Sequence, residues 1–314
     1  MRYQKVILLG GSGFVGKHLA VELACRGYQV TIPCRRPQRH SDLKVLANIK
    51  LIEANILETQ QLDKLCRSQD VAVNLLGILN ETSKTSFRHL HVDFVKNLVQ
   101  ACQTNKIKRL LHISALGADQ ATGSSQYLRS KGEGENMVHT FGQKDLKVTS
   151  FQPSVIFGAD DSFINRFAGI LKMCQGVFPI ACAESRFAPV YVEDLVKLMA
   201  DSIEDKTSWS RRYSVCGPES YSLKQIVQLI SRALGKRCHI VGLPSFLARL
   251  QAVILQNLPG KLFTLDNYRS LQTPSTCDKS STPCPTSFSS YIKGLGSGYD
   301  RRRDYARYRQ QLRN

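Results

Sequence analysis

A glycine-rich run between an apolar segment and a helical pattern constrains the fold of this chain more than any other feature. Residues 6–9 are fully apolar, which is typical of a buried parallel strand. Residues 14–25 carry apolar side chains at helical spacing and end shortly before Gly27. Between these segments, glycines stand three positions apart at Gly10, Gly13 and Gly16. A strand, a glycine turn and a helix in this order predict the first unit of a parallel sheet.

The three glycines suit the binding of a diphosphate. Gly10 permits a tight turn, Gly13 lets the backbone approach a pyrophosphate, and Gly16 lets the helix pack closely on the strand. The free N–H groups and the positive end of the helix dipole would then face the anion. The alternative is a glycine turn without a ligand. We expect dinucleotide binding, with contacts from the whole loop: Gly10, Gly11, Ser12, Gly13, Phe14, Val15 and Gly16.

Strand and helix patterns alternate through the first half of the chain. Strands are predicted at residues 29–33, 50–53, 71–76, 109–113 and 148–151, and helices at 61–67, 94–104 and 127–139. This alternation predicts an α/β fold with a doubly wound parallel sheet. After residue 153 the rhythm loosens, and helices at 163–172, 193–203 and 223–234 with a strand at 213–216 predict a smaller mixed α/β lobe.

These patterns predict three parts of the chain. We expect a Rossmann domain at residues 1–155 and a smaller C-terminal lobe at residues 156–270 that completes the cleft. Residues 271–314 would form a Ser/Thr/Pro-rich linker and a basic tail.

The formal net charge of +18, with a sequence pI near 9.6, first suggests a nucleic-acid partner. Part of this charge lies in residues 293–314, and the remainder is scattered without a basic stripe interleaved with aromatic residues. We therefore expect no nucleic acid, and favour phosphate-bearing cofactors and anionic lipid headgroups as partners.

The ten cysteines include no CxxC pair, and none stands beside histidines at zinc-ligand spacing. His89 and His91 are two positions apart, which would point them to different faces of a helix. We expect no metal site. No eighteen-residue apolar span and no signal-peptide pattern is found, so the sequence favours a cytoplasmic protein with reduced thiols.

Two arginines stand where a carboxylate would bind the ribose 2′-hydroxyl of NAD. Arg35 and Arg36 follow the second predicted strand, and the first acid after them is Asp42. Because a guanidinium can bind a 2′-phosphate with two hydrogen bonds, NADP(H) is favoured, and NAD(H) remains an alternative. A solvated basic turn is the other interpretation.

A tyrosine and a lysine at Tyr127 and Lys131 share one face of a predicted helix. The ammonium would lower the pKa of the phenol, which could then exchange a proton with a carbonyl or an alcohol. Ser114, at the end of the fifth predicted strand, is the first candidate for a third catalytic group. Ser124 and Ser125 are alternatives, and each of the three could instead cap a turn.

The GxxGxxG spacing resembles the loop of extended and atypical short-chain dehydrogenase/reductases. Further stretches at residues 113–119, 127–135, 153–168 and 189–194 look like the atypical members related to the 39-kDa accessory subunit of respiratory complex I. The resemblance covers roughly residues 4–275. It implies that Lys131 also holds the nicotinamide ribose and that residues 54–58 lie beside the adenine. Further expected cofactor contacts are Asn55, Ile56, Leu76, Gly77 and Pro153.

This chain departs from the family pattern at three positions. Asn55 replaces an aspartate in the segment beside the adenine. Ala115 stands where the extended family often places its working serine or threonine. Gln152 replaces the arginine that usually precedes the proline, so an anion contact by that arginine is not expected here.

The resemblance leaves two functions open. One is an oxidoreductase that acts on a carbonyl, an alcohol or a quinone-related substrate, or an epimerase/dehydratase-like enzyme. The other is a non-catalytic, NADPH-stabilised accessory or assembly factor of respiratory complex I or of quinone biosynthesis. An amphipathic segment from Phe246 to Leu258, with the basic tail, suggests peripheral contact with the anionic inner face of a membrane. The alternative is that this helix closes the core of its own lobe.

Overall fold

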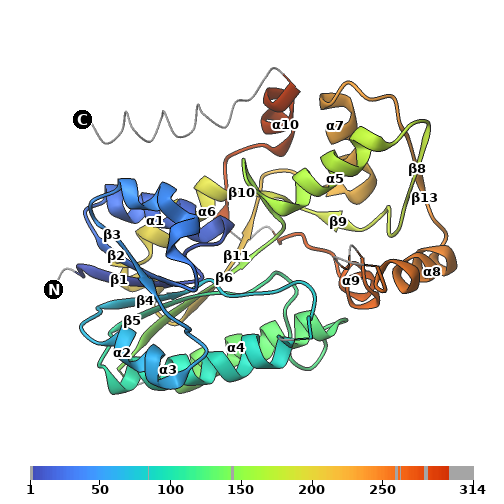
Figure 1. Cartoon of the computed structure of the whole chain (residues 1–314). Coiled ribbons are helices and arrows are strands. Elements are labelled where there is room, and N and C mark those ends of the chain that lie inside the picture. Colours follow the sequence, from blue (N-terminus) through green and yellow to red (C-terminus); the bar gives the residue numbers. More distant parts are fainter. Residues whose placement is uncertain are drawn as a thin grey trace.

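An eight-stranded sheet with the order β14-β11-β6-β5-β4-β1-β2-β3 forms the centre of the molecule, and its paired strands are parallel (Figure 1). The computed structural model describes residues 3–83, 85–142, 145–258, 261, 263–278 and 282–296. The strands of this sheet are β1 (Lys5–Leu9), β2 (Gln29–Cys34), β3 (Ile49–Glu53), β4 (Val71–Asn74), β5 (Arg109–Ile113), β6 (Lys147–Pro153), β11 (Arg211–Cys216) and β14 (Thr282–Pro283).

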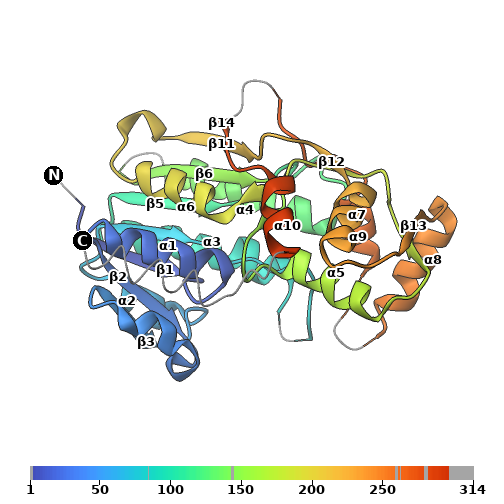
Figure 2. The same ribbon diagram turned by 90° about the horizontal axis from the view of Figure 1, so that it is seen from above.

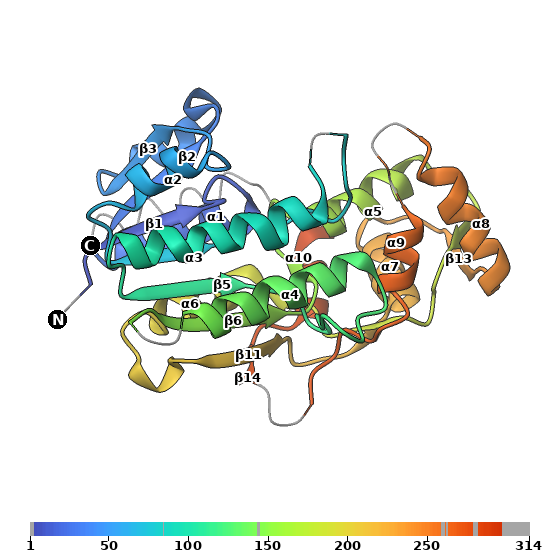
Figure 3. The same cartoon turned by 90° about the horizontal axis from the view of Figure 1, so that it is seen from below.

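Helices cover both faces of the sheet, as expected for a doubly wound α/β fold. Figure 1 shows α1 and α6 on one face and α2, α3 and α4 on the other. Figure 3 shows α3 and α4 lying along β5 and β6. These helices are α1 (Phe14–Cys25), α2 (Thr59–Cys66), α3 (Phe94–Thr104), α4 (Gln126–Phe141) and α6 (Val192–Asp201).

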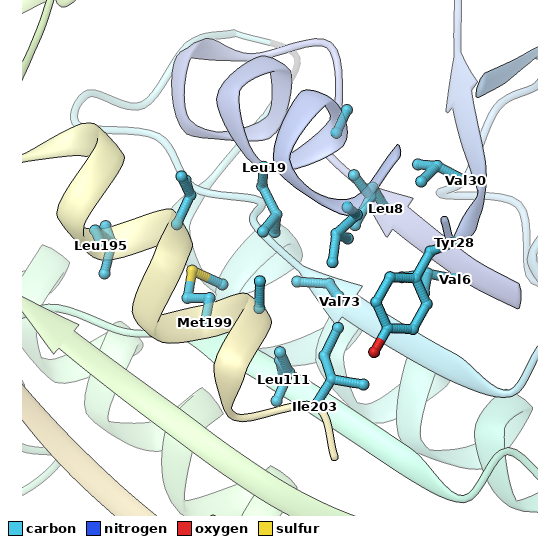
Figure 4. Close-up of a cluster of buried hydrophobic side chains, with 14 of the residues drawn as sticks. Val6, Leu8, Leu19, Tyr28, Val30, Val73, Leu111, Leu195, Met199 and Ile203 are labelled. Carbon is cyan, nitrogen blue, oxygen red and sulfur yellow. The ribbon is translucent and has the colours of Figure 1, made fainter. Parts of the chain in front are cut away.

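Alternate residues of each strand supply the two cores. In β5, Leu111 belongs to the cluster under α1 and α6, whereas Leu110 belongs to the cluster under α2 and α3. Figure 4 shows the first cluster, in which Leu19 of α1 and Met199 of α6 meet above the sheet. All of these side chains are at most 1% exposed, so the sheet is buried on both faces and its strands read as continuous apolar runs.

A smaller lobe extends from the sheet beyond the carboxyl ends of β6 and β11 (Figure 2). Its core includes Phe157, Ile226 and Phe288. It contains three short strand pairs, β7 (Ile156–Phe157) with β10 (Val190–Tyr191), β8 (Val177–Ile180) with β13 (His239–Gly242), and β9 (Arg186–Phe187) with β12 (Tyr221–Ser222). Its helices are α5 (Ser162–Met173), α7 (Leu223–Ala233), α8 (Ser245–Leu255), α9 (Leu265–Ser270) and α10 (Phe288–Gly296).

Strand β11 and helix α6 were predicted within the smaller lobe, but β11 is part of the large sheet and α6 packs on its face. Strand β11 pairs with β6, with Arg211 opposite Thr149. Helix α6 packs on α1, and its Leu195 and Met199 lie in the core under that helix. The prediction divided the chain at a single point in the sequence. The chain, however, leaves the sheet after β6 and returns to it for these two elements.

The segment predicted as a linker is packed against the rest of the molecule. Strand β14 extends the sheet beside β11, and Phe288 of α10 is 1% exposed in the core of the smaller lobe. Cys277 forms a disulfide with Cys216, which corrects the expectation that all cysteines are reduced thiols. The segment also bonds to the rest of the molecule through its backbone, since the carbonyl oxygen of Ser275 accepts a hydrogen bond from Ser154 Oγ at 2.7 Å. The basic tail at 297–314 lies outside the described residues.

Candidate functional site

The predicted site residues lie at the carboxyl ends of neighbouring parallel strands. The glycine loop follows β1, Arg35 and Arg36 follow β2, Asn55 follows β3, and Gly77 lies beyond β4. Strand β1 lies between β2 and β4, so the chain reverses its direction of winding there. In open α/β sheets, ligands bind outside the carboxyl ends of the strands at such a point. Further along the same edge are Ser114 after β5 and Pro153 at the end of β6.

The glycine loop has the geometry of a phosphate cradle. Gly10 has a φ of +86°, which a residue with a side chain rarely adopts. A Cβ on Gly16 would lie 2.5 Å from the Gly10 carbonyl oxygen, so α1 can approach the loop only without one. No side chain caps the N-terminus of α1, and its first turn carries no acid. These features fit a pyrophosphate at the N-terminus of α1, with Gly11 and Ser12 in the loop and Val15 in the first turn of the helix.

The two arginines after β2 are exposed to solvent. Arg36 directly precedes the helical turn Pro37–Val45. Asp42, the first acid after these arginines, forms an ion pair with Lys17 of α1 at 2.7 Å. The end of β2 therefore presents two cations, and the first carboxylate that follows is paired elsewhere.

Asn55 has hydrogen-bond partners inside its own loop. Its Nδ2 donates to Glu58 at 2.9 Å, and its Oδ1 accepts the N–H of Leu57 at 3.3 Å. Ile56 packs against the core under α2 and α3, and so does Leu76 beyond β4. These contacts shape the turns after β3 and β4.

Helix α4 carries Tyr127 and Lys131 one turn apart, and of the two Lys131 has a hydrogen bond to the sheet. The Lys131 side chain is 4% exposed, and its Nζ donates to the carbonyl oxygen of Ile113, the last residue of β5, at 2.6 Å. The same Nζ would lie 3.8 Å from a Cβ on Gly77. Burial lowers the pKa of Lys131 to about 8, against the opposing effect of Glu135.

The pKa of Tyr127 moves opposite to the expectation from the sequence. Burial raises it to about 12, whereas the argument from Lys131 predicted a lowered value. Burial decides the direction because it disfavours the charged phenolate. The phenol is therefore protonated at neutral pH and can donate a proton.

The three candidate serines have different surroundings. Ser124 Oγ donates to the carbonyl oxygen of Arg269 at 2.9 Å, and Ser125 Oγ caps α4 by accepting the N–H of Leu128 at 3.1 Å. Ser114 is 5% exposed, and its Oγ has no hydrogen-bond partner among the described residues. Of the three, Ser114 retains a hydroxyl available for a ligand.

His91 is a site residue that the sequence argument passed over. It lies 3% exposed in the π-helical turn His89–Asp93, and its ring contacts Tyr127 edge-to-face with the ring centroids 5.8 Å apart. Its Nε2 accepts the N–H of Ile78 at 3.2 Å, and its Nδ1 lies 2.9 Å from Ser130 Oγ. His91 therefore joins the turn after β4 to helix α4.

The charge state of His91 follows from the same surroundings. Burial and the Lys131 ammonium lower its pKa to about 3, so the ring is neutral. Because Nε2 accepts, Nδ1 carries the proton towards Ser130. A Cβ on Gly134 would lie 2.1 Å from the His91 carbonyl oxygen, so α4 can pack against this turn only with glycine there. In the sequence, the Gly-x-Gly pattern at residues 132–134 was the available signal.

A second buried polar pair lies one turn further along α4. Gln152 Nε2 donates to both carboxylate oxygens of Glu135 at 3.0 Å, and Ser214 Oγ donates to Gln152 Oε1 at 3.2 Å. The residue that departs from the family pattern therefore orients a carboxylate that is 1% exposed. Since Glu135 raises the pKa of Lys131, this pair favours the ammonium form.

Among the described residues, no group of three or more His, Cys, Asp or Glu side chains is placed to hold a metal ion. No described helix is both long enough and apolar enough to cross a membrane.

Comparison with known proteins gives a consistent family. The model of the NAD dependent epimerase/dehydratase family matches residues 6–216. The mitochondrial NADH-ubiquinone oxidoreductase 40 kDa subunit of Neurospora crassa is 24% identical over 251 residues, which cover 79% of this chain and 65% of that protein. The chain thus spans just under two thirds of the length of that relative.

A bacterial relative and a solved structure add to this comparison. A ceramide reductase of Caulobacter vibrioides is 22% identical over 241 residues, covering 76% of this chain and 73% of that protein. The fold is similar to that of UDP-glucuronic acid 4-epimerase from Bacillus cereus, solved with UDP-glucuronic acid and NAD. That match has a TM-score of 0.69 and 18% identity, and covers 94% of this chain and 98% of the other.

Proposed function

Because the chain belongs to the NAD dependent epimerase/dehydratase family, we propose that it binds NADP(H) and acts as an oxidoreductase on a carbonyl or alcohol, with a quinone-related compound as an alternative substrate. The family and the glycine loop support a nicotinamide dinucleotide in general. The step to NADP(H) rests on Arg35 and Arg36, which are exposed at the end of β2.

The observation that supports the catalytic proposal is the position of Lys131 and Ser114 at the end of β5, with Tyr127 one turn away on α4. Lys131 Nζ donates to the last carbonyl oxygen of that strand. Ser114 is the next residue, and its Oγ has no hydrogen-bond partner among the described residues. Tyr127 lies one turn earlier on the same face of α4 as Lys131. A buried hydroxyl and ammonium, with a half-buried phenol one turn away on the same helix, suit a reaction at a carbonyl oxygen.

Each group has a separate role in this proposal. The protonated phenol of Tyr127 donates a proton to the substrate oxygen, and the Lys131 ammonium stabilises the phenolate that remains. Ser114 Oγ orients the substrate oxygen. When bound, the nicotinamide supplies or accepts the hydride. A phenol pKa of about 12 makes proton donation the favoured role at neutral pH, which is the direction of carbonyl reduction. The name of the Caulobacter relative, a ceramide reductase, agrees with that direction.

The cofactor is tested by gentle purification, followed by mass spectrometry of any bound nucleotide and thermal shift with each coenzyme. We expect bound NADP(H). Arg35→Ala should weaken NADP(H) binding on the order of tenfold more than NAD(H) binding, because the guanidinium meets only the 2′-phosphate. Arg39→Ala, another exposed arginine after β2, is the matched control. Equal losses for both coenzymes would remove the 2′-phosphate assignment.

The reaction is tested by NADPH oxidation with a panel of carbonyl compounds and quinones. Tyr127→Phe should abolish turnover and leave NADPH binding intact, since only the proton is lost. Turnover that survives in this variant would contradict the role of Tyr127.

A second candidate function is a non-catalytic accessory or assembly factor in which NADPH is a structural element, with a respiratory-complex or quinone-biosynthesis partner at a membrane. The observation that favours it is the name of the fungal relative, a subunit of a respiratory enzyme. Bound NADPH that does not exchange, together with no turnover across the panel, would support this candidate over the oxidoreductase.

A further inference from the structure

We propose that the far end of the smaller lobe is a docking surface for an anionic lipid bilayer. This surface, the lobe tip, consists of α8 with the turn that follows it to Leu258, the β8–β13 pair and the end of α5. It makes the membrane contact of the second candidate function specific to one part of the molecule. It does not depend on the dinucleotide site, so its failure would leave the proposed oxidoreductase unaffected.

The first observation is the orientation of α8. Its buried residues are Ala248 and Ala252, which are at most 1% exposed. Four of its six large apolar side chains are exposed, among them Phe246 at 70% and Ile254 at 56%, whereas Leu247 and Leu255 are half-buried. A surface helix normally turns its apolar side chains inward to a core. The sequence left open that this helix closes the core of its own lobe. That arrangement explains the buried alanine face but not the exposed apolar side chains.

Exposed apolar residues concentrate at the lobe tip. Nine of the twelve large, exposed hydrophobic side chains in the described part of the chain lie there, whereas the other three are scattered over the dinucleotide-binding half. A concentration of exposed apolar side chains marks an interaction site, whereas single exposed residues do not. The nine are Ile170, Met173, Val177, Val241, Phe246, Leu250, Val253, Ile254 and Leu258.

The elements that carry these residues adjoin one another. Strands β8 and β13 pair in parallel, with His239 opposite Val177. Pro179 of β8 lines an apolar groove of about 260 Å³ together with Leu250 and Ile254 of α8. Figures 1 and 3 both show α8 and β13 at the end of the molecule farthest from β1, β2 and β3.

The charge of the same segments identifies the partner. Residues 162–183 and 220–265, which contain all of these elements, include no Asp or Glu. Asp266 is the next acid along the chain, and its carboxylate accepts the N–H groups of Gln126 and Tyr127 at the start of α4. Exposed cations accompany the apolar residues and form no ion pair with another described residue: Lys172, Arg232, Lys236, Arg237 and Arg249.

Exposed apolar side chains with a cationic rim and no acid are complementary to an anionic lipid surface. The apolar side chains enter the boundary between headgroups and acyl chains, and the cations bind the headgroups. Because the lobe lies beyond the carboxyl ends of β6 and β11, docking through its tip also sets that edge of the sheet on the side of the molecule nearer the bilayer.

The experiment is co-sedimentation of the full chain with vesicles. We expect binding to equimolar phosphatidylcholine and phosphatidylglycerol, weaker binding to phosphatidylcholine alone, and loss of binding at high salt. The double variant Phe246→Ser/Ile254→Ser should bind at least about tenfold more weakly, since each large side chain contributes about that factor when buried. Phe141→Ser is the matched control, because Phe141 is 59% exposed at the far end of α4.

A charge pair and a size measurement complete the test. Arg249→Glu should weaken binding to the anionic vesicles, whereas Arg67→Glu, on an exposed residue of the dinucleotide-binding half, should not. The Phe246→Ser/Ile254→Ser variant retains the basic tail, so unchanged binding would assign the contact to the tail and overturn the proposal. A stable dimer that this variant converts to monomer, without vesicle binding by the unaltered chain, would identify a second copy as the occupant and would also overturn it.

Discussion

Polar side chains are buried at both ends of strand β5, but they differ in their hydrogen bonding. At its start, Arg109 is fully buried, and its guanidinium donates to five oxygens, which belong to Lys147, Thr149, Ser202, Ile203 and Ser208. At its end, His112 Nε2 and Ser114 Oγ are buried without a partner among the described residues.

This difference separates a stabilising region from the proposed binding region of the same sheet. A buried polar atom without a partner costs about 1–3 kcal/mol. The Arg109 cluster joins β5, β6 and the segment after α6, and leaves nothing for a ligand to complete. The carboxyl edge, by contrast, has vacant hydrogen-bonding capacity beside Lys131, where a ligand in the cleft would supply the missing groups.

The largest expected effect is at the start of β5. Arg109→Ala leaves buried carbonyl oxygens without their donor, so the free energy of unfolding should fall by roughly 3–5 kcal/mol. Urea denaturation measures this loss. Dinucleotide affinity of the protein that remains folded should not change. Arg67→Ala, at a side chain that is 66% exposed, should stay within about 0.5 kcal/mol of the parent. A comparable loss in both variants would show that the hydrogen bonds of Arg109 add no more to the free energy of unfolding than an exposed arginine does.

At the other end of the strand, removal of a buried charge should stabilise the protein. Folding lowers the pKa of Lys131 from 10.5 to about 8, so at pH 7 the buried ammonium costs roughly 3 kcal/mol. Lys131→Met removes this cost and loses one hydrogen bond, worth about 1 kcal/mol, so its net gain should be roughly 2 kcal/mol. It should also lose turnover.

The pH dependence checks the sign of this effect. Between about pH 8 and pH 10.5 the unfolded chain holds a proton on Lys131 that the folded chain has released, so stability of the parent rises with pH. The advantage of Lys131→Met should therefore disappear near pH 10.5. Lys96→Met, at an exposed position of α3, should show no such convergence. Destabilisation by Lys131→Met at pH 7 would refute the argument.

A smaller effect is expected on the acid side. Folding lowers the pKa of His91 from 6.5 to about 3, so its contribution to stability is present above pH 6.5 and is lost as the pH falls towards 3. His91→Gln removes this proton linkage, and relative to the parent it should gain roughly 1 kcal/mol between pH 7 and about pH 5.5. Acid titration of the free energy of unfolding measures it. His89→Gln, two residues away and exposed, should follow the parent curve.

The contrast between the two ends also shows what the sequence could predict. The strand at residues 109–113 and the position of Ser114 followed from apolar patterning and the alternation of elements, because burial on both faces leaves a continuous apolar run. The pairing of Tyr127 with Lys131 on one helix face followed from helical periodicity. Local rules suffice for these features.

Other features depend on contacts between distant segments. His91 contacts Ile78, Tyr127 and Ser130 only because a π-helical turn packs on Gly134, and the Gly-x-Gly pattern at residues 132–134 does not tell which segment approaches it. The raised pKa of Tyr127 depends on burial, which the spacing of two residues does not report. The Cys216–Cys277 disulfide likewise requires the segment after α9 to return to the sheet.

The smallest expected effect on stability is the most informative for function. Ser154 and Ser114 lie on the same edge, but Ser154 Oγ donates to the carbonyl oxygen of Ser275 at 2.7 Å, whereas Ser114 Oγ has no described partner. Ser154→Ala should therefore cost about 1–2 kcal/mol of the free energy of unfolding, and Ser114→Ala should change it by less than about 0.5 kcal/mol or raise it slightly. If Ser114 orients the substrate oxygen, Ser114→Ala should lower kcat/KM on the order of a hundredfold, although it barely changes stability. NADPH affinity should not change. A marked loss of stability in Ser114→Ala would mean that its hydroxyl already serves the fold, and the edge of the sheet at β5 would then be as structural as its start.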